Sequence, residues 1–255
     1  MINLVKTKEE VEIMRVGCKI LAGVMNKLEK KVDVGISGLE VDELAERLIC
    51  EAGCEPAFKG YGADDGNPFP ATICFSVNEG IVHGIPSEYK IKDGDVIKID
   101  IGLIYKGYYA DMARSVLVGN TSKEAKNLVE TTKKSFYKGL ATIKNGSTLF
   151  DFASAVQGYV ERRGYFMVKN LVGHGIGRNL HEAPQIPNYV SKKINNFTFC
   201  TGMTVALEPM VNIGTSENKV APDGWTFITS DGSLSAHWEN TILVTEKGTE
   251  ILTKV

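Results

Sequence analysis

The chain is organised around residues 95–119, where apolar and polar positions alternate over the first half of the segment. The apolar positions recur at every second residue, namely Ile97, Ile99, Ile101 and Leu103. This period is typical of a β-strand with one buried face. Lys106-Gly107 then provides a two-residue turn in which the glycine can adopt a positive φ. The pattern therefore predicts an antiparallel hairpin whose second strand begins at Tyr108.

The register of this hairpin decides whether its two acidic residues meet. With Lys106-Gly107 as the loop, Gly102 pairs with Asp111 and Asp100 pairs with Ala113. Asp100 and Asp111 are then diagonal neighbours on one face, with Cα atoms about 7–8 Å apart, and can hold a divalent cation between them. A three-residue loop would instead place the acids on opposite faces. Taken alone, both residues also fit the plainer interpretation of solvated acids on a strand.

Helical patterns flank the hairpin on both sides. Thr7 and Glu10 form a capping box, and apolar residues at helical spacing predict a helix from residue 8 to about Lys30. Ser37 and Glu40 predict a second helix that ends near Gly53. Residues 56–70 are rich in glycine and proline and are expected to form a loop. A short strand is predicted at 72–77, followed by a turn at 78–86 that carries His83.

The helical pattern then starts again after the hairpin. Thr121 and Glu124 predict the capping box of a third helix, and a fourth helix is expected from 146–148 to Gly164. Gly35, Ser37 and Gly53 correspond to Gly146, Thr148 and Gly164 at a constant offset of 111 residues. This repeat predicts an α+β fold with two pseudo-symmetric halves. No low-complexity linker separates them, so we expect one domain, residues 1–255, with halves at approximately 1–118 and 119–255.

Composition narrows the class of protein. A net charge of −2 gives no reason to expect nucleic acid or an anionic membrane as a partner. The five cysteines are scattered, and the C-x3-C spacing of Cys50 and Cys54 fits neither a redox pair nor a zinc site. A reducing, cytoplasmic location follows as the simplest expectation. The first residues lack the apolar core of a signal peptide, and no later run is long enough to span a bilayer.

The segment 173–184, GHGIGRNLHEAP, contains two of the four histidines. Its glycines argue against a helix, and positions seven apart on an extended chain face opposite ways, so we expect different roles for His174 and His181. His181-Glu182 does not continue into the helical zinc motif H-E-x-x-H, because position 185 is Gln. A lone histidine is more often structural than functional. Two histidines among glycines favour function.

Two glutamates interrupt apolar stretches in the second half. Glu208 lies in 203–211 and Glu239 lies in 234–246, and both stretches are expected to be strands. A carboxylate inside an apolar strand needs a partner, because burying an unpaired charge costs several kcal/mol or more. Neither stretch offers Arg or Lys nearby in sequence. His237 shares a face with Glu239 by the two-residue period, and is either its neighbour or a plain strand position.

In this order, Asp100, Asp111, His174, Glu208 and Glu239 resemble the metal ligands of the methionine aminopeptidases. The resemblance extends from the first helix to the end of the chain. It is carried by D-x10-D in a hairpin, GHGIG…HE, LEP and WEN, with HGIP at 83–86 and DGW at 223–225. It implies the pita-bread fold and a type I enzyme, because only 27 residues separate His181 from Glu208.

The resemblance also implies the chemistry of the site. Two divalent metal ions (Co, Mn, Fe or Zn) would be held by the five ligands, with Glu208 also moving a proton. His181 would contact the scissile carbonyl, and His83 the peptide or the developing tetrahedral centre. The expected reaction is removal of the N-terminal methionine from newly made polypeptides and peptides when the second residue is small. We expect a monomer and leave open a transient association with the ribosome.

Four further residues are expected to surround the methionine side chain. Sulfur and aromatic surfaces suit a thioether, which favours Cys74, Phe69, Leu180 and Trp225. The sequence departs from the family at residues 62–68, which look longer than usual, and at Leu180, where relatives often carry an aromatic residue. Both departures bear on the shape of the pocket and leave the metal ligands unaffected.

Two other interpretations compete with this one. X-Pro aminopeptidases and prolidases share the fold, but they usually carry a large N-terminal domain, whereas here the first helix begins at about residue 8. A pita-bread module that has lost catalysis and serves as a binding protein would normally lack one or more ligands. All five are present here.

Overall fold

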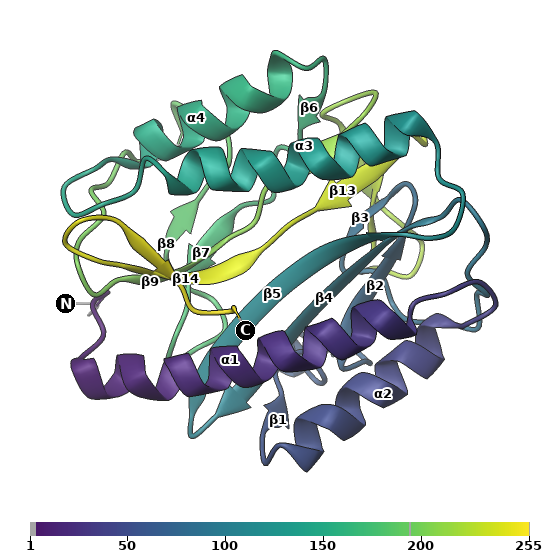
Figure 1. Cartoon of the computed structure of the whole chain (residues 1–255), viewed down its shortest axis with the longest axis horizontal. Coiled ribbons are helices and arrows are strands. Elements are labelled where there is room, and N and C mark those ends of the chain that lie inside the picture. Colours follow the sequence, from purple (N-terminus) through teal and green to yellow (C-terminus); the bar gives the residue numbers. More distant parts are fainter. Residues whose placement is uncertain (1–3, 194, 255) are drawn as a thin grey trace.

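Two helical layers enclose a central layer of strands (Figure 1). The computed structural model describes residues 4–193 and 195–254, so residues 1–3, 194 and 255 of the predicted domain lie outside the described part. Its α-helices are α1 (Lys8–Lys31), α2 (Gly38–Glu51), α3 (Lys123–Leu140) and α4 (Leu149–Glu161). In Figure 1, α1 and α2 lie below the strands, and α3 and α4 lie above them. The predicted α+β fold is confirmed.

The helix starts agree with the capping signals in all but one case. Thr7 with Glu10 and Ser37 with Glu40 form the predicted capping boxes of α1 and α2. The prediction of Thr121 as the cap of α3 is wrong. Ser122 is the N-cap and its hydroxyl accepts a hydrogen bond from the backbone N–H of Ala125, so the helix begins one residue later than expected. Either hydroxyl residue suits an N-cap, which is why the sequence alone chose the wrong one.

The two helix pairs repeat each other in detail. Gly35 and Gly146 have φ of 85° and 87°. Each lies just before an N-cap, Ser37 in the first half and Thr148 in the second. These are conformations that only glycine adopts readily. The correspondence supports an internal repeat, while the domain limits 1–255 and the boundary at 118/119 stay predictions.

The sheet of the first half is built on the predicted hairpin. Its strands are β1 (Glu55–Pro56), β2 (Ile73–Val77), β4 (Val96–Tyr105) and β5 (Tyr108–Leu117). β5 pairs with one edge of β4, and β1 and β2 share the other edge. Tyr105 pairs with Tyr108, and the turn residues Lys106 and Gly107 have φ of 49° and 79°. Positive φ at both positions is typical of a type I′ turn. The predicted register is confirmed throughout.

The sheet of the second half is made of shorter strands. Its spatial order is β15 (Thr249–Ile251), β14 (Asn240–Val244), β9 (Thr204–Leu207), β7 (Gly173–Gly175) and β8 (Glu182–Ile186). Two three-stranded sheets complete the central layer. One contains β6 (Phe166–Met167), β10 (Met210–Asn212) and β13 (Ser235–His237), and the other β3 (Gly80–Val82), β11 (Asn218–Val220) and β12 (Phe227–Thr229).

Two strand predictions, one turn prediction and one loop prediction need correction. The stretch 203–211 is two strands in different sheets, β9 and β10, which are separated at Glu208-Pro209. The stretch 234–246 likewise divides into β13 and β14 at Trp238-Glu239. Residues 78–86, expected to be a turn, include the short strand β3, and the 56–70 loop includes β1's Pro56 and a 3₁₀ turn at Ala63–Asp65. In the two divided stretches, apolar residues stand close on both sides of Glu208 and Glu239, so periodicity did not reveal the breaks.

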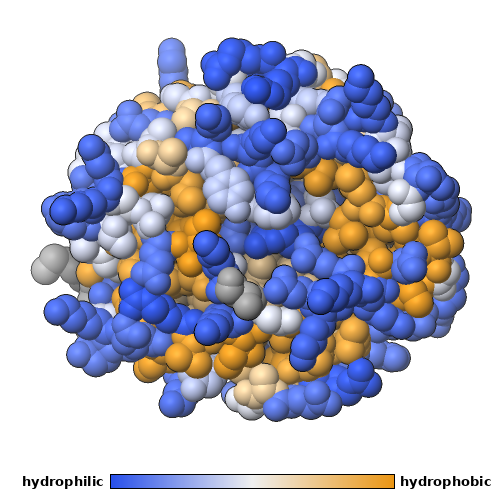
Figure 2. Space-filling model, viewed as in Figure 1, coloured by the Kyte–Doolittle hydropathy of each residue, from blue (hydrophilic) through white to orange (hydrophobic). Residues whose placement is uncertain are grey.

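The two halves are joined directly by backbone contacts. Ala113 in β5 and Glu239 exchange backbone hydrogen bonds of 3.0 and 3.4 Å. One apolar core includes the buried faces of α1 and α2 together with Ile176 and Leu243 of the second half, and another includes the buried faces of α3 and α4. On the face shown in Figure 2, hydrophilic residues cover the upper part, and apolar side chains reach the surface in several separate areas lower down. In the described part of the chain, no helix has the length and apolarity needed to cross a membrane.

Candidate metal centre and pocket

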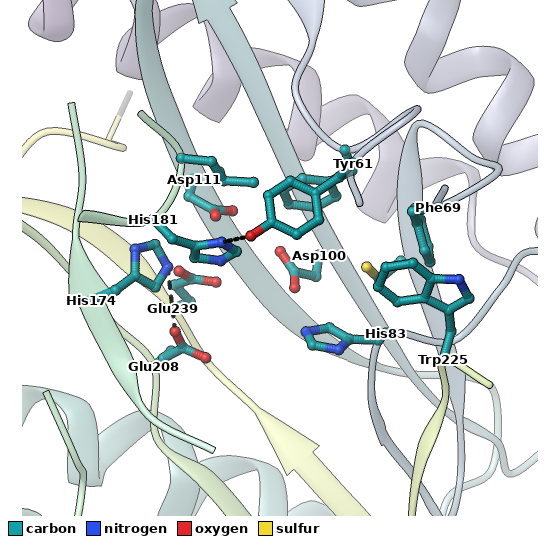
Figure 3. Close-up of a pocket in the computed structure, with 13 residues that line it drawn as sticks. Tyr61, Phe69, His83, Asp100, Asp111, His174, His181, Glu208, Trp225 and Glu239 are labelled. Atoms are coloured by element: carbon teal, nitrogen blue, oxygen red, sulfur yellow. Dashed lines mark hydrogen bonds and ion pairs between the residues drawn. The ribbon is translucent and has the colours of Figure 1, made fainter. Parts of the chain in front are cut away.

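A pocket opens where the sheets of the two halves meet, and the residues predicted to bind metal or substrate line it (Figure 3), whereas His237 does not. The predicted residues that line it are His83, Asp100, Asp111, His174, His181, Glu208, Glu239, Phe69, Cys74, Leu180 and Trp225. Phe58 and Tyr61 also line it and were not predicted. The structure thus brings the predicted residues together, while the roles assigned to them stay predictions.

The hairpin fixes the two aspartates from regular strand positions. Asp100 lies opposite Cys74 of β2, so sulfur and carboxylate are cross-strand neighbours at the pocket wall. Asp111 is buried, and its backbone is held on both sides by Thr241. Its N–H donates to Thr241 Oγ1 at 3.0 Å, and its carbonyl accepts from the same hydroxyl at 2.8 Å. The first half therefore presents its two carboxylates on a rigid ladder that is fastened to the second half.

The second half presents its glutamates where strands break. Glu208 stands between β9 and β10, and its carbonyl accepts a 3.1 Å hydrogen bond from the amide of Asn188. Glu239 stands between β13 and β14, and its carbonyl accepts a 2.6 Å hydrogen bond from the guanidinium of Arg114. Leaving the ladder frees both side chains to turn into the pocket. The break explains why acids can occur inside stretches that are otherwise apolar.

His237 lies against both glutamates. Its Nε2 is 3.7 Å from Glu208 Oε2 and 3.9 Å from Glu239 Oε2, which confirms the expected proximity to Glu239. The ring is buried, and neither of its nitrogens has a hydrogen-bond partner among the described residues. Burial also lowers the pKa of His237 to about 3, which keeps the ring neutral. A neutral, unpartnered imidazole beside carboxylates is suited to a cation.

His174 is held with a free lone pair toward the carboxylates. Its Nδ1 lies 2.9 Å from the carbonyl oxygen of Gly175, and because a carbonyl can only accept, Nδ1 carries the proton. Nε2, which lies 3.6 Å from Glu208 Oε1, is then unprotonated. Burial lowers the pKa of His174 to about 3, in keeping with a neutral ring. This is the form of histidine that binds metal ions.

His181 meets His174 although the two are seven residues apart. The rings are edge to face with centroids 4.4 Å apart, because residues 176–181 fold back between β7 and β8. The alternation of an extended strand therefore did not apply to this segment. Tyr61 Oη lies 2.6 Å from Nδ1 of His181, and the dashed line in Figure 3 marks this contact. The sequence predicted His181 in the site but missed the tyrosine that orients it.

His83 enters the pocket from a strained backbone position. Its φ is 58°, which is uncommon for a residue with a side chain and costs of order 1–3 kcal/mol. The next residue, Gly84, accounts for the tight path, since a Cβ there would lie 2.4 Å from the carbonyl oxygen of Phe75. The ring packs edge to face with Phe227 and Trp225. Burial lowers its pKa to about 4, so the ring is neutral.

The four carboxylates form a concentration of negative charge without a matching cation. Burial, followed by mutual repulsion, raises the pKa of Asp111, Glu208 and Glu239 well above their ordinary values, and burial raises that of Asp100 to about 7. None of the ion pairs between described residues brings Lys or Arg to these carboxylates. One oxygen each of Asp100, Asp111 and Glu239 is buried without a hydrogen-bond partner.

These donors fit divalent metal ions. Two buried groups bring ligand atoms within 4.8 Å of one another, one made of Asp100, His237 and Glu239 and the other of Asp111, His174 and Glu239. Glu239 belongs to both, as a bridging ligand would. Oxygen ligands supplemented by imidazole suit Mn, Fe, Co or Zn. The orphaned oxygens, the raised pKa values and the shared glutamate are all accounted for by cations at this position.

The opposite wall of the pocket is apolar. Phe69 and Trp225 pack edge to face with centroids 5.2 Å apart, and Phe58, Cys74 and Leu180 complete the wall. Phe58, Phe69, Cys74 and Leu180 are all buried, so the wall is set before any ligand binds. Phe58 and Tyr61 lie in the glycine-rich loop 56–70. Aromatic side chains within a glycine-rich loop were the only feature of the sequence that could have indicated that Phe58 and Tyr61 line the pocket.

Comparison with known proteins identifies the class. Residues 12–246 match the model of metallopeptidase family M24. The chain therefore belongs to metallopeptidase family M24. Within that family it is 46% identical to methionine aminopeptidase 1 of Bacillus subtilis, over 98% of both chains. The crystal structure of methionine aminopeptidase from Thermotoga maritima superposes with a TM-score of 0.93 at 40% identity, covering 98% of this chain and 99% of that one. The chain is thus a member of the methionine aminopeptidases, and the pita-bread fold is confirmed.

The prolidase branch is a more distant relation. The prolidase of Pyrococcus horikoshii gives a TM-score of 0.79 at 24% identity, and the match covers 99% of this chain but 64% of the prolidase. This likeness shows the shared fold alone.

Proposed function

We propose that this metallopeptidase removes the N-terminal methionine from peptides and newly made polypeptides when the second residue is small. One observation carries the proposal, namely that a cluster of buried carboxylates and neutral histidines faces an apolar, sulfur- and aromatic-lined wall across one pocket. The first side of the pocket suits amide hydrolysis, and the second suits a thioether side chain. The names of the relatives with full-length matches support the same activity.

Five residues would hold two divalent metal ions, namely Asp100, Asp111, His174, Glu208 and Glu239. Four carboxylates carry −4 and two divalent ions carry +4, so the site is neutral when loaded. The bound ions would supply a hydroxide at neutral pH and polarise the scissile carbonyl. His237 lies close enough to Glu208 and Glu239 to hold both carboxylates in place, or to bind through its own nitrogen. Metal analysis of the purified protein would distinguish among Co, Mn, Fe and Zn.

The chain's own residues would manage the protons. Glu208 is the proposed shuttle, as the resemblance to the methionine aminopeptidases implies, and from the pocket wall it would accept a proton from water and deliver it to the leaving amine. When Tyr61 donates to Nδ1 of His181, the proton of the neutral ring lies on Nε2, which can donate to the oxygen of the scissile carbonyl. His83 lies on the other side of the pocket and would contact the peptide or the developing tetrahedral centre.

The apolar wall would select methionine. Sulfur–aromatic contacts with Phe69 and Trp225 are worth roughly 0.3–1.5 kcal/mol each, and Cys74 and Leu180 complete the surface around the side chain. A methionine pocket discriminates against one methylene more or less by only about 1–3 kcal/mol, so norleucine peptides should be cleaved slowly. The second side chain would face the mouth of the pocket, where a large residue clashes.

A peptide panel tests this proposal directly. Release of the first residue is measured for Met-Ala, Met-Gly, Met-Lys, Leu-Gly and Ala-Pro peptides, with purified protein to which each metal has been added. Preference for Met-Ala and Met-Gly supports the proposal. Preferential cleavage before proline would instead indicate an X-Pro enzyme. Stoichiometric metal binding with no cleavage of any peptide would indicate a binding module.

The cellular setting is part of the same proposal. We place the enzyme in the cytoplasm as a monomer that meets polypeptide N-termini during or just after synthesis, with transient contact at the ribosome. Neither nucleic acid nor membrane is a proposed partner. Sedimentation of the purified protein, alone and with ribosomes, measures both the oligomeric state and the contact.

A further inference from the structure

The loop that carries His181 is fastened from behind by the first residues of the described chain. Residues 176–181 connect β7 to β8, and His181 and Leu180 face the pocket. On the other side of the loop, Lys6 extends from the segment before α1, and its ammonium lies 2.8 Å from Glu182 Oε2. The partners are 176 residues apart in sequence. Figure 1 shows the N-terminal end beside β9, where Val5 bridges to Met203.

The contact between Lys6 and the loop is close and dry. The Lys6 side chain is 1% exposed and that of Glu182 is 12% exposed. The lysine stem crosses directly over Gly177, where a Cβ would lie 2.1 Å from Lys6 Cε. The backbone N–H of Lys6 donates to the carbonyl of Gly202 at 2.9 Å, so the lysine is itself held in place. A glycine at 177 is therefore required by the lysine that packs on it.

Glu182 passes this restraint on to the loop. Its Oε2 accepts from Lys6, while its Oε1 accepts from the backbone N–H groups of Arg178 and Asn179 at 2.6 and 3.0 Å. One carboxylate thus joins the N-terminal segment to the turn that leads into His181, which is its own neighbour in sequence. Ion pairs that also satisfy backbone donors hold a geometry more firmly than a surface pair does.

A second bridge runs parallel to the first. The Arg178 guanidinium contacts both carboxylate oxygens of Glu10, at 2.6 and 2.7 Å. Glu10 is the residue that completes the capping box of α1, and it also accepts a 2.8 Å hydrogen bond from the hydroxyl of Tyr108. The loop is thereby tied to the start of α1 and to β5 at once.

We propose that Lys6, with Glu182, is a positioning pair for His181, and that Arg178 with Glu10 supports the same loop. The inference rests on the proposed function, in which His181 donates to the scissile carbonyl. Lys6 touches neither substrate nor the carboxylate cluster, so it acts only through the loop. Loss of the pair should let His181 move away from its productive position while the metal ligands and the apolar wall stay in place.

The test uses the full chain with Lys6→Met, Arg178→Met and the matched control Arg15→Met. Arg15 lies on α1, as Glu10 does, and forms a two-point contact with Glu250, so its removal weakens the docking of that helix without touching the loop. We expect Lys6→Met to lower kcat on a Met-Ala peptide by roughly 10- to 100-fold, since small misplacements of catalytic groups have effects of this size. KM, metal content and the activity of the control should change less than about twofold.

A second readout does not depend on activity. Hydrogen exchange of residues 176–182, measured by mass spectrometry on metal-free protein, should accelerate in Lys6→Met and in Arg178→Met but not in Arg15→Met. Unchanged kcat together with unchanged exchange in Lys6→Met overturns the proposal and leaves the pair a purely structural one. If Lys6→Met does not fold, the more exposed Arg178→Met decides by the same two measurements. If the wild-type protein is inactive but hydrogen exchange of residues 176–182 is accelerated only in Lys6→Met and Arg178→Met, the proposed function is refuted, while the role of the pair in holding the loop is supported.

Discussion

The two halves of the molecule build their helices alike and their functional strands differently. In each pair the second helix begins after a glycine with positive φ and a hydroxyl N-cap, at Gly35 and Ser37 before α2 and at Gly146 and Thr148 before α4. The first half then offers its two carboxylates from a continuous ten-residue ladder in β4 and β5. The second half offers Glu208 and Glu239 from breaks between strands of different sheets. The helices thus repeat between the halves, whereas the carboxylates of the site come from a regular hairpin in one half and from strand breaks in the other.

The largest effect is expected from the ligands themselves, in either half. Asp111→Asn and Glu208→Gln should each lower kcat/KM by roughly 10³-fold or more, because several kcal/mol of charge stabilisation depend on an intact cation site. Chelation of the wild-type protein should abolish activity, and addition of Mn, Co or Fe should restore it. Peptide hydrolysis and metal analysis measure both effects. Full activity in a preparation free of metal would contradict the two-metal site.

The three histidines with proposed roles in the reaction or in metal binding sharpen the comparison, since His83 comes from the first half and His174 and His181 come from the second. His83→Ala and His181→Ala should lower kcat by about 10²-fold or more while metal content stays near that of the wild type. His174→Ala should instead lose metal, because its Nε2 faces Glu208 with a free lone pair. Inductively coupled plasma analysis of the three variants separates the roles. Equal loss of metal in all three would show that the assignment is wrong.

The buried charge should also be visible in stability. Burial raises the pKa of Asp100 from 3.8 to about 7, so the folded state binds this proton more tightly than the unfolded state does. Its contribution is favourable below about pH 4 and is lost as the pH rises toward 7. Without metal, Asp100→Asn should therefore gain stability over the wild type as the pH rises from 4 to 7.5, measured by urea unfolding.

Asp93 is a matched control of opposite sign. Its exposed carboxylate accepts from the backbone and side chain of Asn120, which lowers its pKa. The contribution of Asp93 is therefore present above its unfolded pKa and lost as the pH falls, so Asp93→Asn should cost stability at neutral pH. If the difference in free energy of unfolding between Asp100→Asn and the wild type does not vary with pH, the inference that Asp100 is buried without a compensating cation is wrong.

The smallest effects, on the free energy of unfolding, are expected at the two glycines that precede α2 and α4. Gly35→Ala and Gly146→Ala should each lower the free energy of unfolding by about 1–2 kcal/mol, because both positions require positive φ and nothing blocks a Cβ there. Gly23→Ala, within α1 and also in open space, should raise it by roughly 0.5–1 kcal/mol. Thermal or urea unfolding measures all three. Clearly unequal losses at 35 and 146 would break the correspondence between the halves.

Local signals predicted the fold better than long-range ones. The hairpin register followed from one two-residue turn, and three of the four helix starts followed from their caps, because these features depend on neighbours in sequence. The breaks at Glu208 and Glu239 were missed because the apolar run continues through them, and only pairing with distant strands divides it. Thr121 was preferred to Ser122 because both residues can cap a helix.

The residues of the site could also be predicted only in part from the sequence. Residue types in a familiar order placed every predicted residue in one pocket, whereas Tyr61 depends on the path of the 56–70 loop, which no periodicity describes. The meeting of His174 and His181 was equally hidden, because it follows from a loop that folds back and not from strand alternation. Lys6 and Glu182, which are 176 residues apart in sequence, carried no sequence signal of their contact.

The backbone junction of Ala113 with Glu239 has a consequence for the order in which the molecule is made. Synthesis proceeds from the amino end, so Asp100 and Asp111 exist while Thr241 and Glu239, which secure and complete their site, do not. A nascent chain that stops short of residue 239 holds at most three of the four carboxylates and lacks the residue shared by both candidate ligand groups. With the proposed set of ligands, the enzyme therefore acquires a complete metal site only after its last strands have been synthesised.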